Sequence, residues 1–511
     1  MKKNNRVVCG ILQFLVYLLW AASFLLYAIA LWIRDSLDVT FLQIINTLAE
    51  GTEGANLRSL IFGPQGLRCL AFFGGSLLFI AVYAAVKHAL RLRTEKKSDA
   101  AALHRYRFAA GLGNFVLVAV AAGTAALAFI TAGLNEENLR LLYLRTTNTK
   151  LYEREYVRPD ASIIGRDGET KNLLYIYLES MESTYTSTAC GGYLPDVDLI
   201  PNLAKLAAEN VSFSPAGVVG GLRVTNNADY TKGALYAMTT GLPVSIVKKP
   251  DLSFTAADWV DFKPGVVSLG DVLEEAGYAQ EFLCGSDGEY AGRKQYFEQH
   301  GNYKVFDYFR AVEAGYIDRD YKVFWGFEDR RLYGIAKEEL TSLSQQGRPF
   351  NFTMLTVDTH YPDGWVCELC REEYDEQYYN VIACADRQLA DFLTWCGEQP
   401  WYEDTVIVIV GDHLTMKRTM FSSAAPEQRR VYNCIINSAV SAPENEKHRT
   451  ATTFDMFPTT LAAMGFRIDG DRLGLGTNLF SEEQTLAERI GFDKLNNELL
   501  QKSQFYEAYL N

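Results

Sequence analysis

The sequence predicts an α/β domain, with a mostly parallel central sheet flanked by helices, that follows N-terminal transmembrane helices. Three observations support this fold class. The first 134 residues of the 511-residue chain hold long apolar runs without charge, whereas the rest has an ordinary water-soluble composition. In that second part, short buried-strand runs alternate with segments of helical periodicity. Several of these strand runs end in an acidic residue or histidine, at the edge where such sheets bind ligands.

The N-terminal part contains three uncharged apolar runs that are expected to cross a membrane: Val7–Ile33, Cys69–Val86 and Phe108–Leu134. The first is long enough to span a bilayer with some tilt, and it is too long for the apolar region of a cleaved signal peptide. The second is close to the lower length limit, so a buried core helix is the alternative interpretation for it.

The basic residues predict the orientation of these spans. The loop between the second and third runs is dense in Lys and Arg: Lys87, Arg91, Arg93, Lys96, Lys97, Arg105 and Arg107. Because cytoplasmic loops are enriched in these residues, the N-terminus and this loop are expected in the cytoplasm, and the chain after Leu134 outside.

We therefore predict a transmembrane region over residues 1–134, a charged membrane-surface connector over 135–171 and an extracytoplasmic domain over 172–511. The formal net charge of −13 argues against a nucleic-acid partner.

Two strand runs of the same design indicate one candidate site. Val406–Val410 is a β-branched run, and Asp412 and His413 follow it after a chain-breaking glycine. Asn172–Leu178 is a second buried-strand run, which Glu179 follows directly. Since the carboxyl ends of parallel strands meet at one edge of a sheet, these three side chains are expected to face one crevice, where they could bind one cation.

Each of these residues also has a simpler interpretation. Asp412 could be a turn residue with His413 as a bystander, and Glu179 could cap the next helix. Glu182 lies close by and is a weaker candidate for the same role.

Thr231 is expected to open a helix that stops at Gly241, where a C-terminal glycine precedes a proline. The local sequence favours a helix-capping role for this threonine. The functional interpretation is a nucleophile, since a helix N-terminus and a nearby cation would stabilise its alkoxide and an attached phosphate.

Two further strand runs lead to residues suited to a phosphate group. Phe350–Thr356 is followed by a loop that carries His360, and Tyr278–Leu283 by a loop that leads to Arg293. The guanidinium donors of an arginine suit phosphate recognition. A solvated surface arginine is the alternative for Arg293.

The remaining pattern completes the alternation of strands and helices. It predicts helices at Ile200–Glu209, Ser268–Ala276, Asp329–Leu343, Tyr374–Gly397 and Phe454–Met464, and a strand at Arg430–Ile436. Cys367 and Cys370 could form half of a zinc site, but the sequence has no second such pair. A structural disulfide is therefore favoured outside the cytoplasm.

Five motifs occur in order along the chain. They are YLES at Tyr177–Ser180, the helix-opening Thr231, DTHYPDG at Asp358–Gly364, GDH at Gly411–His413 and RLGLGTNLF at Arg472–Phe480. In this order they resemble the alkaline phosphatase/sulfatase superfamily. They are most similar to its membrane phosphoglycerol transferases, the group of phosphoglycerol transferase I and lipoteichoic acid synthase.

The resemblance, which covers about Asn172 to Phe480, implies a set of site residues. The implied metal ligands are Glu179, Thr231, Asp412 and His413. Thr231 would also be the nucleophile, and the implied contacts of the substrate headgroup are His360, Tyr290 and Arg293. His360 is the preferred proton carrier. The sulfatase nucleophile motif, Cys or Ser followed by x-Pro-x-Arg, is absent, so sulfate ester cleavage is not expected.

The resemblance further implies transfer of phosphoglycerol from phosphatidylglycerol to an extracytoplasmic acceptor, a periplasmic glucan or another envelope glycan. A metal-activated threonine would form a phospho-threonine intermediate. The ion would be one divalent cation, with Mn²⁺ favoured by the hard ligands and Zn²⁺ or Mg²⁺ as alternatives. The protein would be a multi-pass protein of the bacterial cytoplasmic (inner) membrane with a periplasmic catalytic domain.

Three alternatives stay open at this point. A lipoteichoic acid synthase-type polymerase would extend a glycerol-phosphate acceptor into chains. A phosphoethanolamine transferase would share the arrangement of metal and threonine but consume another lipid. An inactive domain could bind headgroups as a sensor.

Overall fold

The computed structural model describes residues 2–37, 63–96, 99–131, 136–166, 168, 170–194, 197–216, 219–244, 265–421, 424 and 428–510. The chain divides into two compact units, one that contains the N-terminal helices and one that contains the chain from Leu141 onward. The boundary that the sequence predicts between residues 134 and 135 lies outside the described residues.

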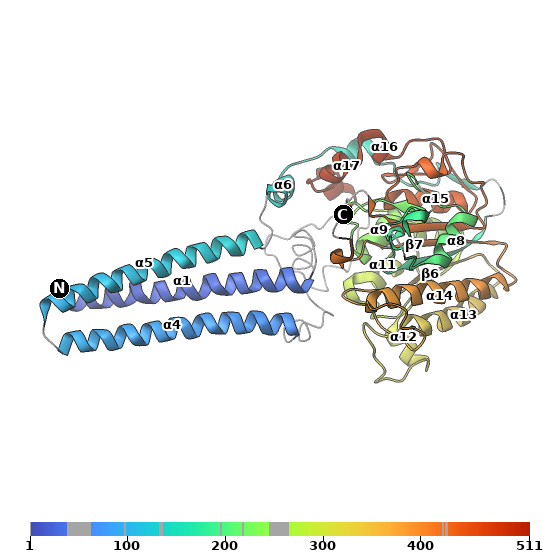
Figure 1. The fold of residues 1–511 in the computed structure, drawn as a ribbon. Helices are drawn as coiled ribbons and strands as arrows, with labels where there is room; N and C mark the ends of the chain where they lie inside the picture. Colours follow the sequence, from blue (N-terminus) through green and yellow to red (C-terminus); the bar gives the residue numbers. More distant parts are fainter. Residues whose placement is uncertain are drawn as a thin grey trace. The chain divides into compact units, whose positions relative to one another are not determined.

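Among the described residues, three N-terminal helices are long and apolar enough to cross a membrane: α1 (Lys2–Leu37), α4 (Pro64–Lys96) and α5 (Ala100–Thr131). They lie side by side (Figure 1). Lys87 of α4 donates to Asn114 Oδ1 of α5 over 2.7 Å, and the Asn114 amide donates to Gln13 Oε1 of α1 over 3.0 Å. Such hydrogen bonds hold apolar helices together where no hydrophobic force does.

The exposure of α4 distinguishes between the two interpretations of the run Cys69–Val86, a membrane span and a buried core helix. Only 6% of its most apolar window is buried inside the structure. The interpretation of Cys69–Val86 as a buried core helix is therefore wrong, and a lipid-facing helix fits its exposed apolar surface.

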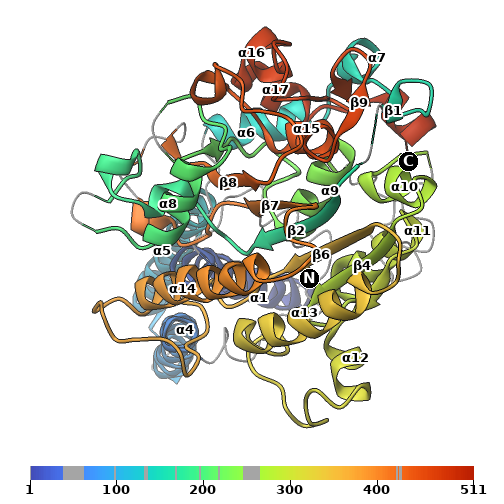
Figure 2. The same cartoon turned by 90° about the vertical axis from the view of Figure 1, so that its right-hand side faces the viewer.

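In the described part of the chain, seven strands form the central sheet in the order β3-β8-β7-β2-β6-β4-β5, and Figure 2 shows its central strands. Their bounds are β2 (Asn172–Leu178), β3 (Gly221–Leu222), β4 (Ala279–Cys284), β5 (Lys304–Phe306), β6 (Phe350–Leu355), β7 (Thr405–Gly411) and β8 (Val431–Ile436). The five strands from β7 to β5 in this order are parallel, and β8 and β3 add the antiparallel edge. The prediction of a mostly parallel sheet is confirmed.

Helices cover both faces of this sheet (Figure 2). One face packs on α8 (Pro201–Glu209), α12 (Tyr308–Glu313), α13 (Asp329–Ser344) and α14 (Gln377–Gly397). The other face packs on α9 (Thr231–Thr240), α10 (Leu269–Glu275), α11 (Arg293–Gln299) and α15 (Met456–Ala463). The central strand β2 is buried on both faces, because Leu174 and Ile176 enter one core and Tyr175 and Tyr177 the other. This two-sided burial explains its unbroken apolar run.

The structure also describes smaller elements. They are the helices α6 (Glu136–Leu144), α7 (Leu151–Glu155), α16 (Leu486–Ile490) and α17 (Phe492–Glu498), and the strand pairs β1 (Ile164–Arg166) with β9 (Phe466–Ile468) and β10 (Arg472–Leu473) with β11 (Gly476–Thr477).

Part of the charged connector contributes to the core of the large domain. Leu151 and Tyr152 are buried, and the Tyr152 ring meets Tyr506 edge-on at 5.1 Å between ring centroids. The pairing of β1 with β9 adds a second attachment. The sequence shows no sign of this packing, because the segment is short and rich in charge.

Candidate active site

Two neighbouring strands bring Glu179, Asp412 and His413 together. β2 and β7 are parallel and pair Leu178 with Gly411, so the residues that follow both strands emerge at the same edge of the sheet. All three side chains are buried, with 2% of Glu179, 0% of Asp412 and 4% of His413 exposed. The strand geometry therefore explains why residues more than two hundred positions apart share one crevice.

The three side chains converge on one point. His413 Nε2 lies 3.4 Å from Glu179 Oε1 and 3.5 Å from Asp412 Oδ2. One ligand atom of each residue lies within 4.8 Å of the other two. Among the residues that the structure describes, Asp412 Oδ2 has no hydrogen-bond partner. A buried carboxylate oxygen without a partner is costly unless an ion or a substrate satisfies it.

The turns after the two strands fix these side chains. Ser180 has a positive φ of 51°, which turns the chain sharply off β2. Its N–H donates to Asp412 Oδ1 and its hydroxyl to Glu179 Oε1, both over 2.7 Å. At the last residue of β7, a Cβ atom on Gly411 would lie 1.9 Å from the carbonyl oxygen of Met181, so only glycine fits there. The sequence does not reveal the role of Ser180, because serine at a strand end is common.

Thr231 joins this group from a helix. It is the first residue of α9, and the preceding Tyr230 is the N-cap residue, so the capping interpretation of Thr231 is wrong. Thr231 Oγ1 lies 3.4 Å from Glu179 Oε2 and 3.3 Å from His413 Nε2. The hydroxyl thus lies at the N-terminus of a ten-residue helix, where the backbone N–H groups favour negative charge.

The charges of this group are strongly coupled. Burial and the neighbouring Glu179 carboxylate raise the pKa of Asp412 to about 7. Burial lowers the pKa of His413, but the carboxylates of Asp412 and Glu179 outweigh it and raise the pKa to about 9. Without a bound cation, this raised pKa favours the protonated form of His413 near neutral pH, in which it pairs with the Glu179 carboxylate.

Glu182 has a different role from these residues. It is fully buried and pairs with Arg429, whose Nε donates to Glu182 Oε2 over 3.1 Å. Its carboxylate also accepts from the Thr415 N–H over 2.8 Å and the Thr184 hydroxyl over 2.6 Å. These donors saturate the carboxylate, so Glu182 is a structural residue.

His360, Tyr290 and Arg293 form a second group. The Trp325 ring connects them, with its centroid 5.6 Å from that of Tyr290 and 4.9 Å from that of His360. The guanidinium carbon of Arg293 lies 5.6 Å from the centre of the Tyr290 ring. The structure thus brings Tyr290 and His360 together around one tryptophan, with Arg293 beside Tyr290.

Arg293 is not a solvated surface residue, and several of its guanidinium donors bind protein groups. It is 7% exposed. Its Nη2 donates to Ser286 Oγ over 2.9 Å and to the Asp287 carbonyl over 2.7 Å, and its Nε donates to the Tyr290 carbonyl over 3.2 Å. The arginine therefore shapes the loop after β4, which presents Tyr290.

The loop after β6 links the two groups. Thr359, next to His360, donates its hydroxyl to the Glu179 carbonyl over 2.5 Å. Asp329 accepts from the N–H groups of Val357 and Asp358. Burial raises the pKa values of both Asp329 and Asp358, so this pair retains a proton near neutral pH. These contacts hold His360 at the same sheet edge as Glu179.

Sequence reasoning missed the aromatic residues of this region. Phe324 and Trp325 lie against His360, and Trp365 stacks on Phe324 with 6.2 Å between ring centroids. The dense aromatic stretch around Trp325 was the available signal. Asp229 was also missed, although its negative charge helps to raise the pKa of His413.

Known proteins resemble this chain in sequence and fold. The sequence model of the Sulfatase family matches residues 171–466. Phosphoglycerol transferase I of Escherichia coli strain SMS-3-5 is 31% identical over 318 residues, which cover 61% of this chain and 39% of that protein. The chain thus spans about two fifths of the length of this relative.

Two solved structures align with the chain. The lipoteichoic acid synthase LtaP of Listeria monocytogenes has a TM-score of 0.48 at 18% identity and covers 67% of this chain and 81% of its own. A protein of the alkaline phosphatase superfamily from Vibrio parahaemolyticus has a TM-score of 0.45 at 20% identity, with coverages of 70% and 80%.

Proposed function

The chain belongs to the sulfatase family, and from this premise we propose that it is a metal-dependent phosphoglycerol transferase that carries the transferred group on Thr231. The donor is phosphatidylglycerol, and the acceptor is a hydroxyl group of an envelope glycan outside the cytoplasm. One observation carries the proposal above all others: Thr231 Oγ1 lies within 3.4 Å of both Glu179 Oε2 and His413 Nε2. The similarity to phosphoglycerol transferase I supports the choice of the transferred group.

The residues around Thr231 fit a divalent cation, which enzymes of this superfamily use. Glu179, Asp412 and His413 direct ligand atoms to the same buried point, and Asp412 Oδ2 finds no hydrogen-bond partner within the described residues. With Thr231 Oγ1, the set has three oxygen ligands and one nitrogen ligand, which favours Mn²⁺ and admits Zn²⁺ or Mg²⁺. When bound, the cation lowers the pKa of the Thr231 hydroxyl and neutralises charge on the phosphate oxygens.

Thr231 is the nucleophile in the proposed reaction. Its oxygen forms a bond to the phosphorus of the lipid headgroup while the bond from phosphorus to the diacylglycerol oxygen breaks. The N–H groups at the start of α9 stabilise the phosphate that Thr231 then carries. In a second step, an acceptor hydroxyl attacks the same phosphorus and releases Thr231.

The second group of residues receives the glycerol headgroup. Tyr290 is 38% exposed, so its ring is accessible to a ligand, and the charge of Arg293 lies beside it. His360 is half-buried, and the neighbouring Thr359 hydroxyl donates a hydrogen bond to the Glu179 carbonyl. We assign to His360 the proton that the leaving diacylglycerol oxygen gains or that the acceptor hydroxyl loses.

A membrane location follows from the donor. The helices α1, α4 and α5 are long and apolar enough to anchor the enzyme in a bilayer. The Lys and Arg residues near the C-terminal end of α4 and the N-terminal end of α5 favour a cytoplasmic position for the connection between these helices and an extracytoplasmic position for the catalytic domain. In a bacterial inner membrane, this orientation gives the site access to phosphatidylglycerol of the outer leaflet.

Vesicles with labelled headgroups test the donor and the reaction class. With Mn²⁺, the purified full chain is expected to release diacylglycerol from phosphatidylglycerol vesicles and to move single labelled phosphoglycerol groups to a glucan. Release from phosphatidylethanolamine alone would instead identify a phosphoethanolamine transferase, and long glycerol-phosphate chains a polymerase. No release, with the cation shown to be bound, would contradict an enzymatic role and favour a headgroup sensor.

A further inference from the structure

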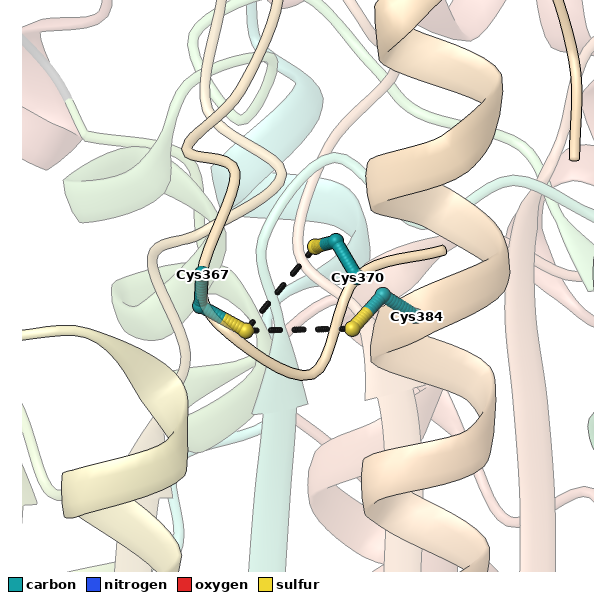
Figure 3. A group of neighbouring side chains, drawn as sticks. All are labelled: Cys367, Cys370 and Cys384. Atoms are coloured by element: carbon teal, nitrogen blue, oxygen red, sulfur yellow. Dashed lines mark hydrogen bonds between the residues drawn. The ribbon is translucent and has the colours of Figure 1, made fainter. Parts of the chain in front are cut away.

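Three cysteines form a cluster outside the candidate active site. Cys367 and Cys370 lie on the loop between β6 and α14, and Cys384 lies on α14 itself (Figure 3). All three are free thiols, and the Cys367 sulfur lies 3.8 Å from each of the other two. Cys367 and Cys384 are 7% and 1% exposed, whereas Cys370 is half-buried. The sequence pair Cys367-x-x-Cys370 thus meets its third member on a helix.

The separations of the sulfurs match those around one ion. A zinc–sulfur bond is about 2.3 Å long, so two sulfurs at the corners of a tetrahedron around zinc lie about 3.8 Å apart. The separations of the Cys367 sulfur from the other two sulfurs have this value, and one ligand atom of each residue lies within 4.8 Å of the others. The thiols therefore need little movement to bind one ion together.

Gln388, one turn along α14 from Cys384, lies against the cysteine cluster. Its Nε2 donates to the sulfur of Cys384 over 3.4 Å and to that of Cys367 over 3.7 Å. The side chain is 7% exposed, and within the described part of the chain its buried Oε1 has no hydrogen-bond partner. Since a half-turn of the amide exchanges oxygen and nitrogen, Gln388 can offer a hydrogen bond to a thiolate or a fourth ligand to an ion.

We propose that Cys367, Cys370 and Cys384 bind one Zn²⁺ ion in a structural site. Three thiolates form a soft ligand set that selects zinc, whereas the oxygen-rich group around Thr231 selects harder ions. Binding of the ion displaces the thiol protons and requires no oxidant. The chain thus has two metal sites of different chemistry.

The zinc site fastens the loop that presents His360. Trp365, two residues before Cys367, stacks on Phe324 beside His360. The backbone N–H of Trp365 donates to the Asp358 carbonyl over 2.7 Å. The site joins this loop to α14 through three bonds to one ion, which fixes the loop more firmly than its hydrogen bonds alone do. The role of the zinc site is to position this loop. The proposed transfer reaction rests on Thr231 and its neighbours, so a result that refutes the zinc site would leave that proposal standing.

Cobalt provides the first test, because cobalt thiolates absorb strongly in the near ultraviolet and cobalt bound by oxygen and nitrogen does not. The reduced full chain is loaded with Co²⁺. The thiolate absorption is expected in the wild type and in Asp412→Asn, and it is expected to be lost in Cys384→Ser. Cys190→Ser, which alters a half-buried cysteine outside the cluster, is the matched control and should retain it.

Zinc itself provides a second test that needs no cysteine variant. In zinc-loaded Asp412→Asn protein, X-ray absorption should show sulfur neighbours at about 2.3 Å. Only nitrogen and oxygen neighbours would overturn the proposal. A disulfide between Cys367 and either partner, found by alkylation and mass analysis of protein taken directly from cells, would overturn it as well.

Discussion

The hydroxyl oxygen of Thr231 lies 3.3 Å from Nε2 of His413, although 182 positions separate the two residues in the chain. One residue opens α9 and the other follows β7, so helix and sheet edge meet at this contact. The hydroxyl therefore lies among the ligand atoms of a candidate cation site and at a helix N-terminus at once. A phosphate attached to this oxygen would be stabilised from both sides.

Replacement of Thr231 is expected to change turnover without changing stability. Thr231→Ala is expected to abolish release of diacylglycerol, because no other group forms the intermediate, and to leave the melting temperature nearly unchanged. Thr231→Ser keeps the hydroxyl and should retain part of the activity. Turnover and thermal unfolding of the three proteins check this, and a fully active Thr231→Ala protein would rule out the proposed nucleophile.

Glu179 and Glu182 are expected to differ although they are close in sequence. Glu179→Gln should weaken cation binding strongly with little loss of stability, because the carboxylate faces the ion. Glu182→Gln should cost about 3 kcal/mol of unfolding free energy, because it removes the buried carboxylate that pairs with Arg429, and should leave the cation stoichiometry unchanged. Denaturant unfolding and metal analysis compare the two variants, and the reverse pattern would contradict the assignment.

His360 is expected to affect turnover more than binding. His360→Asn removes the proton carrier and should lower kcat about 100-fold, while cation affinity stays the same because the residue is outside the ligand group. Steady-state kinetics and calorimetric titration with Mn²⁺ provide the two readouts. An unchanged kcat would show that another residue carries the proton.

The pH dependence of cation binding follows from the pKa of His413. That pKa is raised to about 9 without an ion, so a cation has to displace a proton at lower pH. The affinity should therefore rise with pH, by up to about tenfold per unit for one displaced proton, and level off above about pH 9. Titration calorimetry in buffers of different ionisation enthalpy also counts the released protons. An affinity independent of pH would exclude His413 as a ligand.

The sequence predicts the sheet and its edge well, because the strands that carry the site are unbroken apolar runs. Asn172–Leu178 is found as a strand with the same bounds, and the run Val406–Val410 extends by one residue at each end. Parallel pairing of these two strands then places Glu179 beside Asp412. The order of the outer strands is not predictable in this way, because it depends on long-range pairing that leaves no local pattern.

Residues that act through tertiary contacts escape prediction. Trp325 connects Tyr290 to His360 only because separate loops meet in space. Cys384 looks like an isolated core cysteine in the sequence, and only the packing of its helix against the loop of Cys367 reveals the cluster. For Thr231 the local sequence leads to the wrong prediction. It favours a helix-capping threonine, but Tyr230 is the N-cap residue of α9 and its side chain makes no capping hydrogen bond.

Mass analysis of the Thr231 peptide tests the central claim most directly. The purified full chain is incubated with Mn²⁺ and headgroup-labelled phosphatidylglycerol without an acceptor, and is then digested. The account predicts a phosphoglyceryl group on the peptide that contains Thr231, with diacylglycerol released in equal amount. Diacylglycerol release without this adduct, or with the group on another residue, would contradict it.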